Sequence, residues 1–219
     1  MKADASHNYL ISSPDQVKGT FVLAHGSGAG MNVFFMDAIS EGLTNEDWRV
    51  VRFEFPYMVR QSFTDRRSLP DKIDILLETY RSVVETVKKH YPQPLFVGGK
   101  SMGGRIASLL ADMLYEEGLI EGLICLGYPF HPLKNPDRLR TEHLRSLQVP
   151  TLIVQGERDP MGSLEEVNGY DLSDQIQIRW IPDGDHSFSP RKRSGFTEDQ
   201  NLHQIVRCVD TFMNEVCGR

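Results

Sequence analysis

The chain has 219 residues, of which 40% are hydrophobic and 25% are charged, and its formal net charge is −6. This balance is typical of a folded globular protein, and it argues against intrinsic disorder, a membrane span and a general attraction to nucleic acid. The cysteines are three in number and lack the paired spacing of a zinc site, so we expect neither a disulfide framework nor a metal site.

We expect a single domain over residues 1–219, because this length suits one large core. The first ten residues lack the apolar core of a signal peptide, which favours a cytoplasmic location. No cofactor is expected.

Short β-rich runs that stop at glycine or proline alternate along the chain with segments of helical periodicity. The expected strands lie at 20–26, 48–55, 94–99, 122–128, 151–156 and 175–181. The expected helices lie at 31–43, 73–87, 102–116 and 202–216. This alternation predicts the α/β class, with a mainly parallel sheet covered by helices on both faces. Functional residues of such a sheet are expected in the loops after the carboxyl ends of the strands.

The glycine-rich segment after the strand at 94–99 has two interpretations, because it reads Gly-Gly-Lys-Ser-Met-Gly-Gly. A phosphate-binding P-loop requires a further glycine at the position that Pro94 occupies, so that spacing fails. Gly99, Ser101 and Gly103 instead match Gly-x-Ser-x-Gly between a strand and a helix, which is the pattern of a nucleophile elbow. Glycines at these positions leave room for a tight, strained turn that exposes the Ser101 hydroxyl at a helix N-terminus.

A serine hydroxyl is a poor nucleophile unless an imidazole accepts its proton and an acid orients that imidazole. On this type of sheet the chain order is serine, acid and histidine, each after a later strand. Asp159 follows the strand at 151–156 and His186 follows the strand at 175–181, which makes them the expected acid and base. Glu157 is the competing candidate for the acid.

An elbow of this kind also needs two main-chain amides to stabilise the oxyanion of the reaction. The first is expected from Met102, the residue after the serine. The second is expected from Ser27 in the glycine-rich loop at 23–30, with Gly28 as the alternative donor. A dinucleotide-binding fingerprint is the rival interpretation of that loop, but Met31 stands where its third glycine belongs.

Six motifs along the chain together resemble a known family. They are HGSGAG, FPYM, GGKSMGGRIAS, LGYPFHP, QGERDPMG and DGDHSFSPRKRSG. This set resembles the small α/β-hydrolases described as dienelactone-hydrolase-like, and it is similar to the hydrolase-like domain of the testis-expressed and NSL-complex subunit proteins. The resemblance implies an α/β-hydrolase fold and a Ser101, Asp159 and His186 triad. Dienelactone hydrolases themselves carry a cysteine where this chain has Ser101.

The connection between the strands at 122–128 and 151–156 is short, with about twenty residues at 130–149, so no substantial lid is expected. The segment 56–71 is long for its position and is expected to border the pocket. The residues expected to bind substrate are Gly26, Gly28, Tyr57, Met58 and Phe130.

These features predict a serine hydrolase that acts on a small-molecule ester, thioester or amide, with no nucleic-acid or membrane partner. The alternative is a hydrolase fold that serves as a non-catalytic binding or interaction module. The basic run Arg191–Arg193 has two interpretations as well. It either lies in solvent or leans over the site together with Arg105 and favours substrates that carry a carboxylate or phosphate. The oligomeric state is left open.

Overall fold

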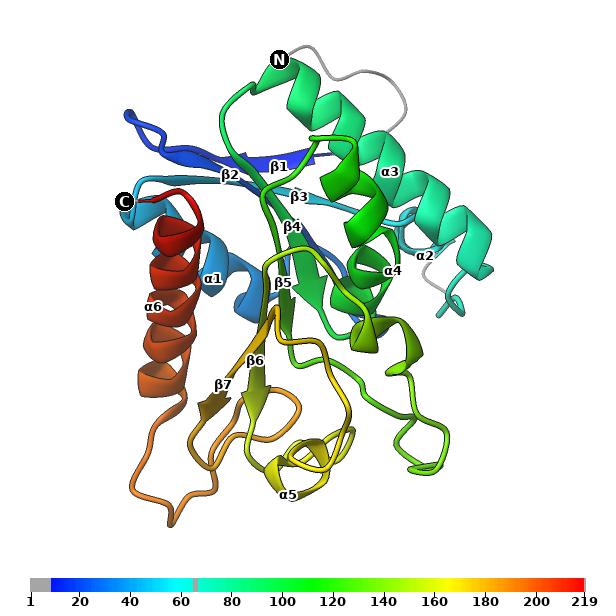
Figure 1. The fold of residues 1–219 in the computed structure, drawn as a ribbon, viewed down its shortest axis with the longest axis vertical. Helices are drawn as coiled ribbons and strands as arrows, with labels where there is room; N and C mark the ends of the chain where they lie inside the picture. Colours follow the sequence, from blue (N-terminus) through cyan, green and yellow to red (C-terminus); the bar gives the residue numbers. More distant parts are fainter. Residues whose placement is uncertain (1–8, 65–66, 219) are drawn as a thin grey trace.

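The computed structural model describes residues 9–64 and 67–218. Seven strands form one sheet in the order β1-β3-β2-β4-β5-β6-β7 (Figure 1). β1 pairs with β3 in antiparallel fashion, and all other neighbouring strands are parallel. The strands are β1 Tyr9–Ser12, β2 Gly19–Ala24, β3 Trp48–Phe53, β4 Leu95–Lys100, β5 Gly122–Leu126, β6 Thr151–Gly156 and β7 Ile176–Ile181.

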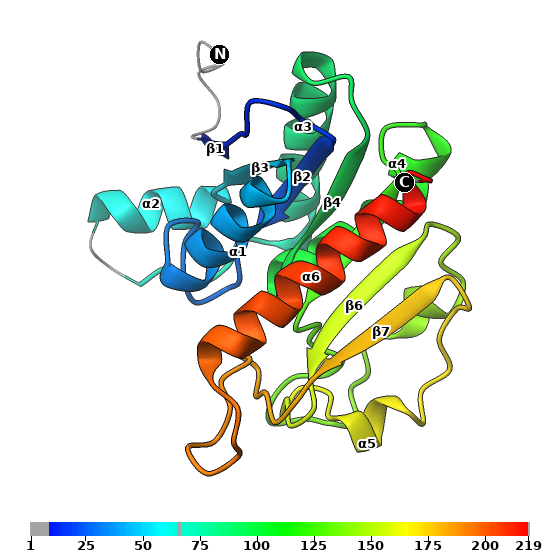
Figure 2. The same ribbon diagram turned by 90° about the vertical axis from the view of Figure 1, so that its left-hand side faces the viewer.

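Helices cover both faces of this sheet, as Figures 1 and 2 show. α1 and α6 pack together on one face, and α3 and α4 pack together on the other. The helices are α1 Phe34–Asn45, α2 Pro56–Thr64, α3 Ile73–His90, α4 Met102–Glu116, α5 Leu164–Val167 and α6 Glu198–Val216, and the 3₁₀ helix η1 spans Glu142–Arg145.

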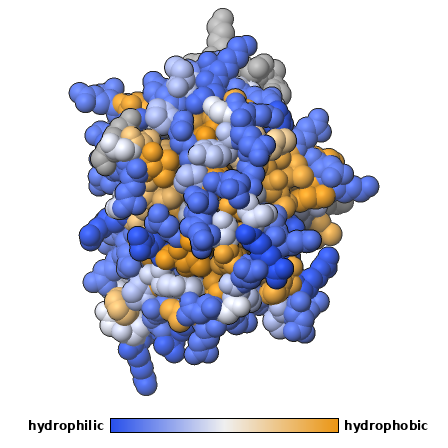
Figure 3. Space-filling view, viewed as in Figure 1, coloured by the Kyte–Doolittle hydropathy of each residue, from blue (hydrophilic) through white to orange (hydrophobic). Residues whose placement is uncertain are grey.

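The core consists of two apolar clusters, one on each face of the sheet. Val83 of α3 and Ile106 of α4 belong to one cluster, and Ile39 of α1 and Val209 of α6 belong to the other. Each of these helices buries one apolar stripe, which is why helical periodicity is visible in their sequences. On the face drawn in Figure 3, hydrophilic side chains surround smaller hydrophobic areas.

All six strands and all four helices expected from the sequence are present. Four further elements have no counterpart among the expected ranges, namely β1, α2, α5 and η1. β1 and α5 have four residues each, which is too short for a periodic pattern. Pro56 ends the extended run of β3 and also begins α2, because a proline at the first helical position loses no intrahelical hydrogen bond.

The connection between β5 and β6 contains one short element, η1, among the described residues. It therefore adds no helical cap to the carboxyl end of the sheet. No helix in the described part of the chain is long and apolar enough to cross a membrane. The N-terminal residues 1–8, which enter the expectation about a signal peptide, lie outside the described residues.

Candidate active site

The turn between β4 and α4 places Ser101 in a backbone conformation that L-amino acids rarely adopt, with φ 50° and ψ −113°. The two flanking glycines are needed because the chain passes close to β2. A Cβ atom at Gly99 would lie 2.5 Å from the carbonyl oxygen of Ala24, and one at Gly103 would lie 2.6 Å from the same atom. The local sequence therefore permits a tight elbow that holds the serine at the carboxyl end of the sheet.

Three polar side chains meet at this elbow, although they follow three different strands. Nε2 of His186, which follows β7, lies 2.9 Å from Oγ of Ser101. Nδ1 of the same ring lies 2.7 Å from Oδ2 of Asp159, which follows β6. The Asp159 side chain is fully buried, whereas 27% of the His186 side chain is accessible. This geometry allows a proton to pass from the serine to an imidazole whose other nitrogen is held by a carboxylate.

The carboxylate of Asp159 receives further hydrogen bonds that hold it in place. Its Oδ1 accepts from the main-chain amide of Met161 at 2.8 Å, and its Oδ2 accepts from Nε2 of Gln155 at 2.9 Å. Glu157, the competing acid, instead accepts a hydrogen bond from a main-chain amide of another loop. Of the two acids, Asp159 is the one in contact with His186. No role was predicted for Gln155, although it begins the motif QGERDPMG, because a polar residue inside a strand does not by itself indicate a function.

The amides expected to form an oxyanion hole lie beside the serine. Met102 is the first residue of α4, so its amide has no acceptor within the helix. Ser27 and Gly28 line the same pocket as Ser101, and among the described residues neither of their amides donates a main-chain hydrogen bond. These amides are therefore available to a negatively charged oxygen.

His25 forms hydrogen bonds that connect the glycine-rich loop to the segment after β3. Its Nε2 accepts a hydrogen bond from the amide of Phe55 at 3.1 Å, so the proton is on Nδ1, which donates to the carbonyl oxygen of Gly26 at 2.7 Å. Burial lowers the pKa of His25, which favours this neutral form. The hydroxyl of Tyr57 donates to the carbonyl oxygens of Gly26 and Ser27. No role was predicted for His25, because its only signal in the sequence is its place directly before the glycines.

Lys100, the residue before the serine, connects the elbow to the histidine loop. Its Nζ donates a hydrogen bond to the carbonyl oxygen of His186 at 2.6 Å. The ammonium group also lies near the rings of Phe35 and Phe188, at 5.9 Å and 5.3 Å from their centroids. Burial lowers the pKa of Lys100 to about 8. No role for this lysine in the serine site was predicted from the sequence.

A pocket of about 470 Å³ contains Ser101 and His186. Gly26 and Gly28 line it as expected, and its apolar wall comes from the start of α1 and the loop before it. The lining residues of that wall are Val33, Phe35 and Met36.

Three other residues expected to bind substrate lie elsewhere. Tyr57, Met58 and Phe130 are buried in the core, and none of them lines the pocket. The start of α2 turns Tyr57 beneath the glycine-rich loop, and Phe130 packs against Gly162. No described residue of 56–71 borders the pocket, so this expectation is corrected. Tyr57 and Met58 point inwards because the first turn of α2 buries them against the core, whereas Phe63 near the end of the helix is exposed.

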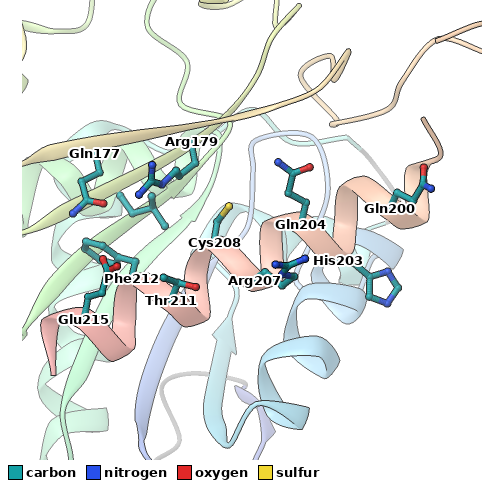
Figure 4. A pocket seen from close by; sticks show the side chains of 11 residues that line it. Gln177, Arg179, Gln200, His203, Gln204, Arg207, Cys208, Thr211, Phe212 and Glu215 are labelled. Atoms are coloured by element: carbon teal, nitrogen blue, oxygen red, sulfur yellow. The ribbon is translucent and has the colours of Figure 1, made fainter. Parts of the chain in front are cut away.

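A separate pocket of about 590 Å³ lies between β7 and α6 and contains none of the three polar residues at the elbow. Figure 4 shows Gln177 and Arg179 on β7 next to side chains of α6 such as Cys208. Within residues 9–64 and 67–218, no group of three or more His, Cys, Asp or Glu side chains is arranged to hold a metal ion.

Comparison with known proteins agrees with this architecture. The sequence model of the family described as Alpha/beta hydrolase domain matches residues 17–214. The chain belongs to the α/β-hydrolase family. The predicted fold class, a mainly parallel sheet with helices on both faces and no substantial lid, is thereby confirmed.

Solved structures of several hydrolases are similar over almost the whole chain. Dienelactone hydrolase from Anabaena variabilis is 19% identical with a TM-score of 0.73, and the match covers 97% of this chain and 93% of that chain. Est1E from Butyrivibrio proteoclasticus, with ferulic acid bound, is 20% identical with a TM-score of 0.70 and coverages of 97% and 96%. A Xanthomonas campestris protein described as an α/β serine hydrolase without lid is 19% identical, with a TM-score of 0.65 and coverages of 97% and 88%.

At these identities the solved structures establish the fold alone. The resemblance to dienelactone-hydrolase-like proteins agrees with one of these neighbours. The finer similarity to the testis-expressed and NSL-complex subunit proteins stays a prediction.

Proposed function

We propose that this protein is a serine hydrolase in which Ser101 is the nucleophile, His186 the general base and Asp159 the acid that orients it. The observation that carries the proposal is the unbroken hydrogen-bonded chain from Asp159 through both nitrogens of His186 to Oγ of Ser101, with distances of 2.7 Å and 2.9 Å. Both lie within the range required for proton transfer between heavy atoms.

In the proposed reaction, Oγ of Ser101 attacks the acyl carbon of the substrate while Nε2 of His186 takes the hydroxyl proton. The amides of Met102 and Ser27 stabilise the oxyanion of the tetrahedral intermediate. His186 then returns its proton to the leaving group, which departs and leaves an acyl-serine. His186 then deprotonates a water molecule, which attacks this ester. The proton passes from His186 to Oγ of Ser101, so that the carboxylic acid product leaves and the serine hydroxyl is restored.

A non-catalytic binding module is the alternative that the sequence left open. A binding surface gains nothing from a serine held at positive φ, or from a carboxylate that is fully buried and aligned with the imidazole. These features favour turnover over binding alone.

The proposed substrates are small-molecule esters, thioesters or amides with a short acyl group. The pocket beside Ser101 has about 470 Å³ and an apolar wall that includes Phe35. Each CH₂ group buried against this wall contributes about 0.8 kcal/mol, and this gain ends where an open pocket without a lid gives way to solvent.

A fluorophosphonate probe tests the nucleophile. We expect covalent labelling of the wild type and of Ser13→Ala, whose serine is exposed near the N-terminus. Ser101→Ala should lose both labelling and hydrolysis of a panel of short-chain esters, thioesters and amides. Labelling of Ser101→Ala at the wild-type rate would show that another residue reacts.

The choice of the acid is tested with the same substrates. We expect Asp159→Asn to lower kcat by about 10⁴-fold, because the amide would favour the wrong imidazole tautomer. Glu157→Gln, its matched control, should keep near-normal turnover. The reverse result for the two acids would reject Asp159.

A further inference from the structure

A third pocket, of about 660 Å³, lies beside the N-terminal half of α4 and shares no lining residue with the pocket that contains Ser101. Its wall is strongly basic. It includes Arg105 of α4 together with Arg138 and Arg140 from the segment that precedes η1. Glu142 and His143 of η1 also line it.

The three arginines lack the partners that such side chains normally have. None of their guanidinium groups forms a hydrogen bond or ion pair within the described residues, and Nε of Arg105 is buried without any partner. Other arginines do have carboxylate partners. Arg81 pairs with Glu117, for example, at 2.8 Å. An unmade hydrogen bond of a buried donor costs free energy, so Nε of Arg105 calls for an acceptor from outside the chain.

The positive charges also repel one another. Burial is the main cause that lowers the pKa of Arg140, and the charges of Arg105 and Arg138 lower it further. Burial, followed by the charge of Arg105, lowers the pKa of His143 to about 4, so its imidazole is neutral at pH 7. Glu142 is the one carboxylate in this wall.

A second acid acts on His143 from outside the pocket wall, and it is already engaged. Asp112 of α4 accepts hydrogen bonds from the main-chain amides of Gln148 and Val149. The wall of the pocket therefore keeps three guanidinium charges against one carboxylate. This excess stands out in a chain whose formal net charge is −6.

We propose that this pocket binds a small anion that carries a phosphate group. Guanidinium groups match phosphate oxygens with paired hydrogen bonds, and the excess of positive charge in the wall complements a dianion better than a single carboxylate. The site differs from one of the two interpretations of the basic run, in which Arg105 leaned over the serine site together with Arg191–Arg193. Arg191 instead forms an ion pair with Asp183. The proposal does not depend on hydrolytic activity.

Isothermal titration calorimetry with inorganic phosphate tests the site at low, constant ionic strength. We expect saturable binding to the wild type and at least about tenfold weaker binding to Arg105→Gln and to Arg140→Gln, since each loses a charge-assisted hydrogen bond. Arg145→Gln is the matched control, because Arg145 lies in η1 outside the pocket and faces Asp171 at 3.6 Å. Its affinity should be unchanged. Acetate should bind more weakly than phosphate.

One further measurement and one substitute variant allow for a variant that does not fold. Circular dichroism establishes that each variant is folded, and Arg138→Gln, at an exposed position, replaces any variant that is not. Failure of the wild type to bind millimolar phosphate would overturn the proposal. Equal affinities of the wild type, Arg105→Gln and Arg140→Gln would also overturn it, as would acetate binding as tight as phosphate binding.

Discussion

Two side chains act on the serine site through main-chain oxygens, His25 on the glycine-rich loop and Lys100 on the histidine loop. Strands β5 and β6 separate β4 from β7 in the sheet, so the loop after β7 must reach back across them to bring His186 to Ser101. Lys100 holds this loop at the carbonyl of His186 itself. The position of the imidazole therefore depends on a buried ammonium group that does not touch the reacting atoms.

Replacement of Lys100 is expected to lower activity without lowering the stability of the fold. We expect Lys100→Met to lower kcat by at least about tenfold, because a hydrogen bond from a charged group is lost at the residue that carries the base. The same change removes a buried charge and keeps the side-chain length, so the free energy of unfolding should be unchanged or higher.

Steady-state kinetics and urea unfolding measure the two effects of this replacement. Lys134→Met, at an exposed loop position, is the control and should change neither quantity. If Lys100→Met retained full kcat, the lysine would have no part in holding the base.

The groups around the serine site are positioned by the helices that carry them. α4 presents the amide of Met102 beside Ser101, and α2 carries Tyr57 beneath the glycine-rich loop. α6 begins after the histidine loop and packs against α1, so its first turn marks the end of the loop that carries His186. That turn is held by a capping box, in which Thr197 and Gln200 exchange hydrogen bonds.

Removal of this cap should weaken the helix. We expect Thr197→Ala to lower the free energy of unfolding by about 1 kcal/mol, because the amide of Gln200 loses its acceptor. Thr211→Ala, at an exposed position in the middle of α6, replaces the same residue type outside the cap. It should be neutral or slightly stabilising, since alanine is the better helix former. Equal losses in the two variants, measured by urea unfolding, would contradict a role for the cap.

The molecule as a whole is built on a single sheet, with an apolar cluster on each face. We propose that it unfolds as one domain, because β2 and β4 contribute side chains to both clusters and couple the two faces. Circular dichroism and tryptophan fluorescence should therefore follow one urea transition with the same midpoint. Two separated transitions would contradict a single domain.

This stability should depend on pH through the buried histidines. The pKa of His143 is about 4 in the folded protein and 6.5 as its ordinary value, so between these pH values the unfolded chain binds a proton that the folded chain does not. Stability should fall as the pH drops from 6.5 towards 4. His143→Gln should reduce this fall, while His25, whose pKa is also lowered by burial, keeps part of it.

The sequence by itself determined the features that depend on local spacing. Positions 99 and 103, on either side of Ser101, must be glycine because neighbouring strand and helix backbones leave no room for a Cβ atom. Two glycines at this spacing around a serine can be recognised directly in the sequence. The placement of Ser101, Asp159 and His186 after the strands β4, β6 and β7 was also predictable, since parallel strands bring their carboxyl ends to one edge. In the structure Ser101 has a positive φ at the turn, and the side chains of Asp159, His186 and Ser101 lie within hydrogen-bond distance of one another in that order.

Only the tertiary structure decided which side chains face one another. Tyr57 and Phe130 have the apolar side chains that a pocket wall requires, but both are buried in the core. Phe35 lines the pocket instead. Arg105 lies near Arg138 and Arg140 rather than Arg191, because the direction of a helical side chain depends on how the helix is docked. Contacts between segments far apart in the chain leave no periodic trace in the sequence, and they are set by the packing of the whole molecule.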